Sequence, residues 1–168
     1  TEISGVIDYP CTDDEHALKT IRDLASHWGE SPTDAKFSRA ESKAPNGRTP
    51  SSILPESRTQ PYECRNLVKS LVDEGSFTEY KKSYGKTIVC GYARIDGWSV
   101  GIVANQRNTV KSTKDGLQFG GVIYSDSADK AARFVMTCNQ KNIPLIFLQD
   151  VTGFMVGSRS EHNGIIKD

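Results

Sequence analysis

Apolar residues form one nearly uninterrupted run late in the chain, over residues 143–148. Such a run predicts a strand that is buried on both of its faces, as in a parallel sheet. The next segment, residues 150–157, places three apolar residues between Gly153 and Gly157. Because ligands of open α/β sheets bind beyond the carboxyl ends of strands, this segment is a candidate ligand-binding loop. A plain strand-to-helix turn, with glycines for its geometry, fits the same pattern equally well.

An amphipathic helix is predicted near the start of the chain. Thr12 and Glu15 have the spacing of a capping box, and apolar residues then recur at helical spacing. Gly29 is expected to end the helix. His16 and His27 belong to this helix, and we expect both at the protein surface.

The composition changes over residues 30–60, which contain four prolines, several serines and few large apolar residues. This composition is typical of a linker that wraps a surface and has no core of its own. Because so long a connection is rare inside a compact domain, it predicts a domain boundary. Residues 1–29 are then the end of one structural unit, and residues 61–168 are the truncated start of another.

Three helices are predicted in the second unit. Apolar spacing predicts one that ends at Gly75, and a capping box formed by Ser76 and Glu79 predicts a short one directly after it. The third begins with Ser125 or Ser127 as its cap. Its side chains expected to face the core are Ala128, Ala131, Ala132, Val135 and Cys138.

Two strands, residues 86–94 and 98–104, flank the dipeptide Asp96-Gly97 and predict a β-hairpin. Residues 105–120 are polar and carry several cations, so we expect a surface excursion there. These cations could contact an anionic ligand such as a CoA phosphate, although a solvated loop is the simpler interpretation. Helices that alternate with strands predict an α/β fold.

The charge balance argues against a nucleic-acid partner, because Lys plus Arg and Asp plus Glu are both 21 and are interspersed. No apolar run approaches the roughly 18 residues of a membrane span, so no membrane partner is expected. The four cysteines are widely spaced and form no CxxC pair, which favours buried free thiols in a reducing, intracellular compartment. They are Cys11, Cys64, Cys90 and Cys138.

The side chains able to do chemistry are few. No nucleophile has a base at motif spacing, and no metal-binding motif or phosphate-binding glycine loop occurs. His162 lies near the candidate loop and could act in acid–base chemistry. Asp150 could be a general base, but anchoring of the loop is favoured, because Asp before a tight turn readily accepts nearby N–H groups. A catalytic site here would therefore need backbone donors and a cofactor.

Several motifs, in this order and spacing, resemble the carboxyltransferase (beta) subunit of biotin-dependent acyl-CoA carboxylases. Residues 143–157 read IPLIFLQDVTGFMVG, which is closest to the methylcrotonyl-CoA branch among the methylcrotonyl-, propionyl- and acetyl-CoA carboxylases. Residues 91–97 read GYARIDG, residues 127–134 read SADKAARF and residues 164–168 read GIIKD. The resemblance spans nearly the whole chain and is weakest in the linker.

The resemblance implies a crotonase-like fold in two related halves. It also implies transfer of a carboxyl group from carboxybiotin to the α-carbon, or vinylogous carbon, of an acyl-CoA, with glycine-rich backbone loops stabilising the two anions. Biotin on a partner carrier and an acyl-CoA substrate are then expected, without a metal. The implied partners are a biotin carboxylase and carrier subunit and further copies of the chain, in a hexameric core. The implied compartment is the bacterial cytoplasm or the mitochondrial matrix.

The chain departs from the family pattern in its glycine loops and in the length of one other loop. Both glycine loops that hold the anions lie outside residues 1–168, so we expect this segment to be inactive alone. The loop over residues 105–120 is longer than is usual in the methylcrotonyl branch. A decarboxylase subunit of the same superfamily and a non-catalytic scaffold remain alternatives. The residues that the resemblance places along the biotin pocket are Thr152, Gly153, Phe154, Val156 and Gly157.

Overall fold

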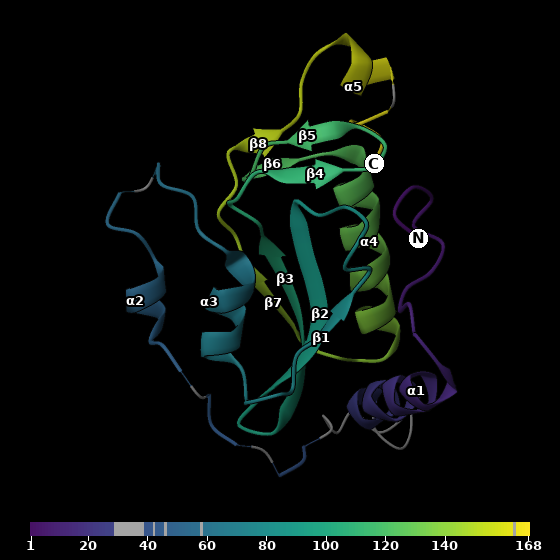
Figure 1. The fold of residues 1–168 in the computed structure, drawn as a ribbon, viewed down its shortest axis with the longest axis vertical. Helices are drawn as coiled ribbons and strands as arrows, with labels where there is room; N and C mark the ends of the chain where they lie inside the picture. The colour runs from purple at the N-terminus through teal and green to yellow at the C-terminus, as the bar shows by residue number, and fades with distance from the viewer. Residues whose placement is uncertain (29–38, 42, 46, 58, 163) are drawn as a thin grey trace.

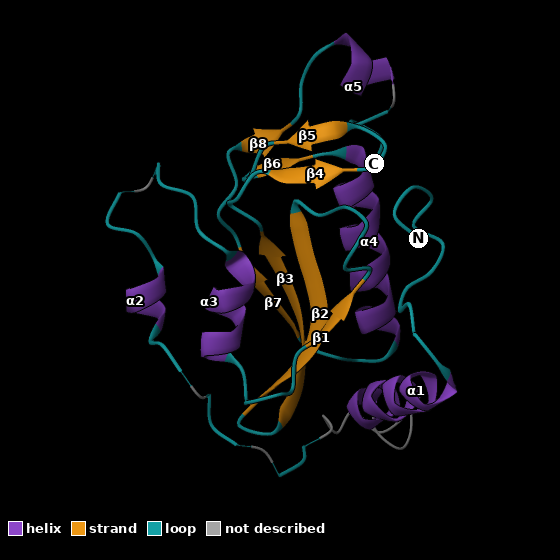
Figure 2. Ribbon diagram, viewed as in Figure 1, coloured by secondary structure: helices purple, strands orange, loops and turns teal. Residues whose placement is uncertain are grey.

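The chain folds as a mixed α/β structure, as the order of predicted elements indicated (Figures 1 and 2). The structure, a computed structural model, describes residues 1–28, 39–41, 43–45, 47–57, 59–162 and 164–168. The helices are α1 (Asp14–Trp28), α2 (Pro50–Ile53), α3 (Cys64–Leu71), α4 (Ser125–Gln140) and α5 (Ser158–His162). The strands are β1 (Thr78–Tyr80), β2 (Ile88–Ile95), β3 (Trp98–Asn105), β4 (Val110–Ser112), β5 (Gly116–Gln118), β6 (Val122–Ile123), β7 (Leu145–Leu148) and β8 (Gly153–Phe154).

The main sheet has four strands in the order β1-β2-β3-β7. The first three are antiparallel neighbours, and β7 runs parallel to β3. The predicted hairpin is confirmed, because Ile95 pairs with Trp98 across a two-residue turn. Asp96 and Gly97 both have positive φ, at 49° and 78°, as the turn between two right-twisted strands requires.

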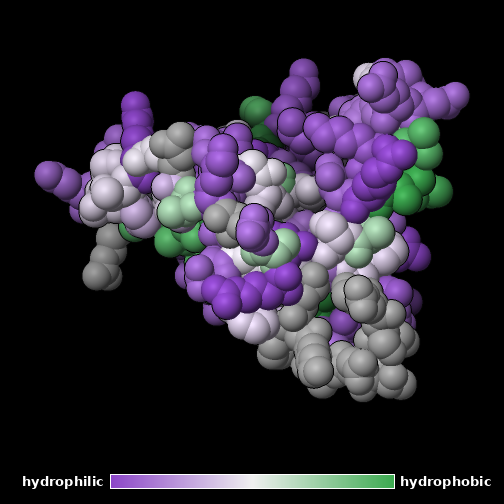
Figure 3. All heavy atoms as spheres, turned by 90° about the horizontal axis from the view of Figure 1, so that it is seen from below, coloured by the Kyte–Doolittle hydropathy of each residue, from purple (hydrophilic) through white to green (hydrophobic). Residues whose placement is uncertain are grey.

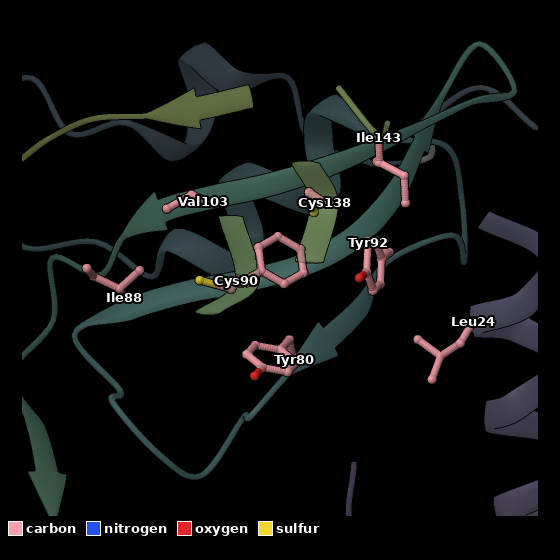
Figure 4. Close-up of a cluster of buried hydrophobic side chains, with 9 residues drawn as sticks. Leu24, Tyr80, Ile88, Cys90, Tyr92, Val103, Cys138 and Ile143 are labelled. Atoms are coloured by element: carbon pink, nitrogen blue, oxygen red, sulfur yellow. The ribbon is translucent and has the colours of Figure 1, made fainter. Parts of the chain in front are cut away.

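Helices cover both faces of this sheet, with α3 on one face and α4 on the other (Figure 2). Successive residues of β2 point to opposite faces and therefore enter different cores. Cys90 and Tyr92 join the core under α4, where the Tyr92 ring lies 5.0 Å from the Phe134 ring (Figure 4). Val89 packs in the other core with Val68 of α3. The sheet is therefore held by two layers of apolar contacts.

Gly101 marks a close approach between the sheet and α4, and Gly91 marks another between β2 and Phe77. A Cβ at this position would lie 2.7 Å from the Cys138 sulfur of α4. At Gly91 a Cβ would lie 2.6 Å from the Phe77 ring. Glycine at these two positions lets the neighbouring segments pack directly on the strand.

The short helix predicted from Ser76 and Glu79 is wrong. Residues 78–80 form the edge strand β1, in which Glu79 pairs with Gly91. The Ser76 hydroxyl donates to the Asp73 carbonyl at 2.7 Å and accepts the Arg94 amide at 3.0 Å, so it closes a turn. Pairing with β2 overrides the local capping pattern, because the backbone N–H and C=O groups on this edge of β2 need hydrogen-bonding partners.

The start of α1 also differs from the prediction. Asp13, and not Thr12, caps the helix, because its carboxylate accepts the His16 amide at 2.8 Å. Leu24 packs into the core under α4, whereas the side chains of Leu18 and Ile21 are 53% and 61% exposed. The predicted stop at Gly29 lies outside the described residues.

Strand β7 lies where the apolar run predicted it, but burial on both faces is wrong. Phe147 is 58% exposed, and Ile146 and Leu148 are only partly buried. The cause is the position of β7 at the edge of the described sheet, with β3 as its neighbour on one side. A continuous apolar run identifies a buried strand without showing which side of it has a partner.

The buried face of α4 is rotated from the one predicted. The helix begins at Ser125, and Ser127 accepts the Tyr124 amide at 2.9 Å from inside its first turn. Of the five residues expected to face the core, Cys138 is fully buried, Ala131 and Val135 pack against the core while partly buried, and Ala132 is exposed. The four residues that the helix buries are Ser127, Lys130, Phe134 and Cys138.

Four short strands gather at the end of the main sheet toward which β3 runs (Figure 1). Strands β4 and β5 form an antiparallel hairpin, and β6 pairs in parallel with β8. The expectation of a solvated loop over residues 105–120 is therefore wrong in part. Gln106 and Gln118 are completely or almost completely buried, because the hairpin folds back onto the sheet and α4. Lys111 and Lys114 remain exposed.

The described parts of residues 39–60 run over the surface. The Ala40 amide donates to the Gly97 carbonyl at the hairpin turn, and α2 buries none of its residues. The face seen in Figure 3 is mainly hydrophilic, with apolar side chains in separate patches. Within the described residues, no helix combines the length and the apolar character needed to cross a membrane.

Candidate functional site

Asp150 lies beyond the carboxyl end of β7, next to the end of the parallel strand β3. Its amide donates to the Asn105 side-chain oxygen at 3.2 Å. Its carboxylate accepts the Tyr62 hydroxyl at 3.0 Å and lies 3.4 Å from Nε of Arg107. Partial burial and this hydrogen bond raise the pKa of Tyr62 to about 12, so the phenol remains a donor. These contacts are those of an anchor, which the sequence favoured over a general base.

The segment after Asp150 is held as a short strand. The Thr152 amide donates to the Gly121 carbonyl at 2.7 Å, and the Met155 amide donates to the Ile123 carbonyl at 2.8 Å. Because both amides already have acceptors, they are not available to bind an anion. Residues 153–154 thus form strand β8, paired in parallel with β6, at the place where the sequence predicted a ligand-binding loop or a plain turn.

The five predicted site residues all lie in this segment and all are exposed. Phe154 and Val156 present apolar side chains that are 50% and 68% exposed. A Cβ added at Gly153 or at Gly157 would meet no atom within 4 Å, so there is open space above the backbone at both positions. The structure thus brings the predicted residues together as an exposed, partly apolar edge.

A hollow of about 700 Å³ adjoins the second half of this segment. The β4–β5 hairpin, the first turn of α4 and residues 155–160 enclose it. Its apolar lining includes Phe119 and Val156, and Asp126 lies among its carboxylates. Burial raises the pKa of Asp126, while Gln118 donates to its carboxylate at 3.3 Å. Asp126 lies in no recognisable motif, so sequence reasoning had no signal for it.

Arg107 was also missed as a site residue, although it lies only two residues past the end of β3. It was grouped with Lys111 and Lys114 as a cation that could meet an anionic ligand. In the structure its side chain is only 15% exposed and turns inward to Asp150. The position of Arg107 next to a strand's carboxyl end was the available signal.

The histidines supply no base at this site. His162 is exposed at the end of α5, and none of its described contacts places it against residues 152–157. The prediction that His27 is a surface residue is wrong, since its ring is buried against Tyr92 and 2.9 Å from the Ser99 hydroxyl. Burial and then Arg94 lower the pKa of His27 to about 4. This histidine belongs to α1, at the opposite end of the sheet from β8 (Figure 1).

Three of the four cysteines are buried free thiols, as expected. Burial raises the pKa of Cys64, Cys90 and Cys138 to about 12, so these thiols are not nucleophiles at neutral pH. Cys11 is exposed, which makes the prediction wrong at that position. In the part of the chain that the structure describes, no group of three or more His, Cys, Asp or Glu residues is placed to hold a metal ion.

Comparison with known families gives one match over residues 1–168, to the carboxyl transferase domain. A probable mitochondrial methylcrotonoyl-CoA carboxylase beta chain of Drosophila melanogaster is 37% identical over 98% of this chain and 29% of its own length. The propionyl-CoA carboxylase beta chain of Saccharopolyspora erythraea is 35% identical over 99% of this chain and 31% of its own length. The chain therefore spans less than a third of these two curated relatives.

Solved structures give a consistent result. The transcarboxylase 12S, described as a hexamer assembly with methylmalonyl-coenzyme A bound, superposes with a TM-score of 0.80 at 35% identity, covering 98% of this chain and 31% of its own. A single-chain, multi-domain long-chain acyl-CoA carboxylase superposes with a TM-score of 0.82 at 28% identity, covering 97% of this chain and 15% of its own. These superpositions confirm the expected crotonase-like α/β fold.

Proposed function

Because the chain belongs to the carboxyl transferase domain family, we propose that it is part of a carboxyltransferase subunit of a biotin-dependent acyl-CoA carboxylase. The subunit would move a carboxyl group from carboxybiotin to the α-carbon, or vinylogous carbon, of an acyl-CoA. The observation that carries the proposal is the exposed apolar edge around Phe154, presented at the carboxyl ends of β3 and β7 in a chain of this family. The segment by itself would be inactive.

The edge formed by Thr152, Gly153, Phe154, Val156 and Gly157 would line the biotin pocket. Biotin has a neutral bicyclic ring and an apolar arm, which suit exposed apolar side chains and the open space above Gly153. When bound, carboxybiotin supplies the CO2 and the group that accepts the α-proton. The side chains around Asp150 would fix the position of the wall, because they are engaged with one another and not with solvent alone.

Among the described residues, Tyr62, His27 and the buried thiols offer no base to the segment over residues 152–157, which agrees with this proposal. Tyr62 has a raised pKa, His27 belongs to a remote core, and the three buried thiols stay protonated. A reaction in which the cofactor accepts the proton needs positioning and backbone donors from the protein. Those donors would come from parts of the subunit outside residues 1–168.

The remaining expectations are part of the same proposal. Residues 1–29 would end the amino-terminal half, residues 30–60 would link the halves, and residues 61–168 would begin the carboxyl-terminal half. The subunit would work with a biotin carboxylase and biotin carrier, and the hexamer named for transcarboxylase 12S suggests the same assembly here. The mitochondrial and bacterial relatives suggest an intracellular enzyme, in a mitochondrial matrix or bacterial cytoplasm.

A direct test uses the full-length subunit with a biotin carboxylase and carrier. Acetyl-, propionyl- and methylcrotonyl-CoA are offered in turn, and carboxylation and its reverse, decarboxylation onto biotin, are both measured. Carboxylation of at least one acyl-CoA is expected. Transfer only from acyl-CoA to biotin would indicate the decarboxylase alternative, and no transfer in either direction would indicate a scaffold.

A further inference from the structure

We propose that Arg107 is a positioning residue, which holds the wall formed by residues 152–157 in register by bridging Gly121 and Asp150. This inference rests on the proposed function for the identity of the ligand, but its geometry stands independently. Arg107 lies two residues past the end of β3, and Asp150 lies two residues past the end of the neighbouring strand β7. The Arg107 side chain reaches from the segment after β3 to the segment after β7.

The backbone of Arg107 closes the base of the β4–β5 excursion. A Cβ at Gly120 would lie 2.0 Å from the Arg107 carbonyl oxygen and 2.8 Å from its Cα. Since no larger residue than glycine fits there, the end of the excursion packs directly against its beginning. The Gln106 carbonyl accepts the Gly121 amide at 2.7 Å and fixes the same closure.

The guanidinium extends this closure to the wall. A Cβ at Gly121 would lie 2.1 Å from Nη1 of Arg107 and 3.2 Å from its Cζ, so the guanidinium packs closely against Gly121. The Gly121 carbonyl accepts the Thr152 amide at 2.7 Å, at the first residue of the wall. Arg107 therefore packs against Gly121, whose carbonyl accepts the amide of Thr152, the first residue of the wall.

The Arg107 side chain also contacts Asp150, which precedes the wall in the sequence. Nε of Arg107 lies 3.4 Å from the Asp150 carboxylate, which also accepts the Tyr62 hydroxyl. The Arg107 side chain is 15% exposed and the Asp150 side chain 49%, so solvent screens this ion pair in part. A planar guanidinium can pack on a peptide and contact a carboxylate at once, which the point charge of lysine cannot do equally well.

The test compares Arg107→Met, Arg107→Lys and Asp150→Asn in the full-length subunit. With free biotin as acceptor, Arg107→Met is expected to raise the KM for biotin by about tenfold, the effect of losing one charge-assisted contact. The KM for acyl-CoA should stay within about twofold. Arg107→Lys should fall between Arg107→Met and the native subunit, and Asp150→Asn should add little to Arg107→Met because the two residues act together.

Arg39→Met is the matched control, because Arg39 also pairs with an aspartate, Asp96, at 3.2 Å, but at the hairpin turn away from the wall. It should change neither KM. An unchanged KM for biotin in Arg107→Met, or an equal change in both KM values, would overturn the inference.

Hydrogen exchange provides a readout that does not depend on the reaction. Exchange at the Thr152 and Met155 amides should become about tenfold faster in Arg107→Met and not in Arg39→Met. If the native subunit transfers no carboxyl group, the proposed function fails, and the exchange result still decides the role of Arg107. Unchanged exchange at these two amides would refute the positioning role.

Discussion

The Tyr62 hydroxyl donates to the Asp150 carboxylate at 3.0 Å, across 88 positions of sequence. This contact joins a residue two positions before α3 to the loop that follows β7, and so connects one helical layer to the candidate site. We expect Tyr62→Phe to lower the free energy of unfolding by about 1 kcal/mol, the net value of one such hydrogen bond. Denaturant unfolding of the full-length subunit measures this. In the Asp150→Ala background, which removes the acceptor, the same substitution should cost clearly less, and equal costs would show that the contact contributes nothing.

His27 makes stability depend on pH. Its pKa is about 4 in the folded chain against an ordinary 6.5, so the stabilisation is complete above pH 6.5 and declines as the pH falls toward 4. The loss should be on the order of 2 kcal/mol by pH 4.5. His27→Gln, which keeps polar atoms near Ser99 but does not titrate, should flatten this decline. Urea midpoints at pH 7, 5.5 and 4.5 check the difference, and the exposed His16→Gln variant should keep the native slope.

Lys130 stabilises the fold through backbone acceptors. Its ammonium group donates to the carbonyls of Tyr84 at 2.9 Å and Ile88 at 2.8 Å, and burial lowers its pKa to about 8. Lys130→Met should cost about 2 kcal/mol, because it leaves buried carbonyls without a donor. Lys82→Met, at an exposed lysine, should stay within about 0.5 kcal/mol. Thermal and denaturant unfolding would contradict this role if the two variants were equally stable.

Gly101 allows α4 to approach the sheet. Gly101→Ala should cost about 2 kcal/mol, because the new Cβ would lie 2.7 Å from the Cys138 sulfur. Cys138→Ala removes that sulfur and should therefore recover part of the loss in the double variant. Additive losses in denaturant unfolding would mean that the alanine clashes elsewhere.

Local signals predicted the elements that depend on neighbouring residues in the sequence. The Asp96-Gly97 dipeptide identified the hairpin correctly, because few residue pairs readily adopt positive φ at two adjacent positions and Asp-Gly is one of them. The Ser76 and Glu79 pair predicted a short helix that does not form, since pairing with the edge of β2 competed with the local cap. Partners fixed by the assembled sheet, such as Tyr62 and Arg107 on Asp150, lie far apart in sequence and have no local signature.

The candidate site, too, was predicted in its location but not in its hydrogen-bonding partners. The segment over residues 152–157 was located by its glycines and the apolar run before it, and the structure places it at the expected end of the sheet. Its hydrogen bonds to Gly121 and Ile123 were not predictable, because β6 is only two residues long and has no periodic pattern. Likewise, the exposure of Phe147 depends on which strands flank β7.

Phe154 is proposed to form part of a biotin-binding wall, and the steady-state kinetics of Phe154→Ala in the full-length subunit test this. The KM for free biotin should rise by about tenfold, as expected for loss of a large apolar contact, while the KM for acyl-CoA stays unchanged. Met136→Ala, which truncates an apolar side chain that is 62% exposed on α4, is the control and should alter neither value. An unchanged KM for biotin in Phe154→Ala, or a rise only in the KM for acyl-CoA, would show that Phe154 does not contact biotin.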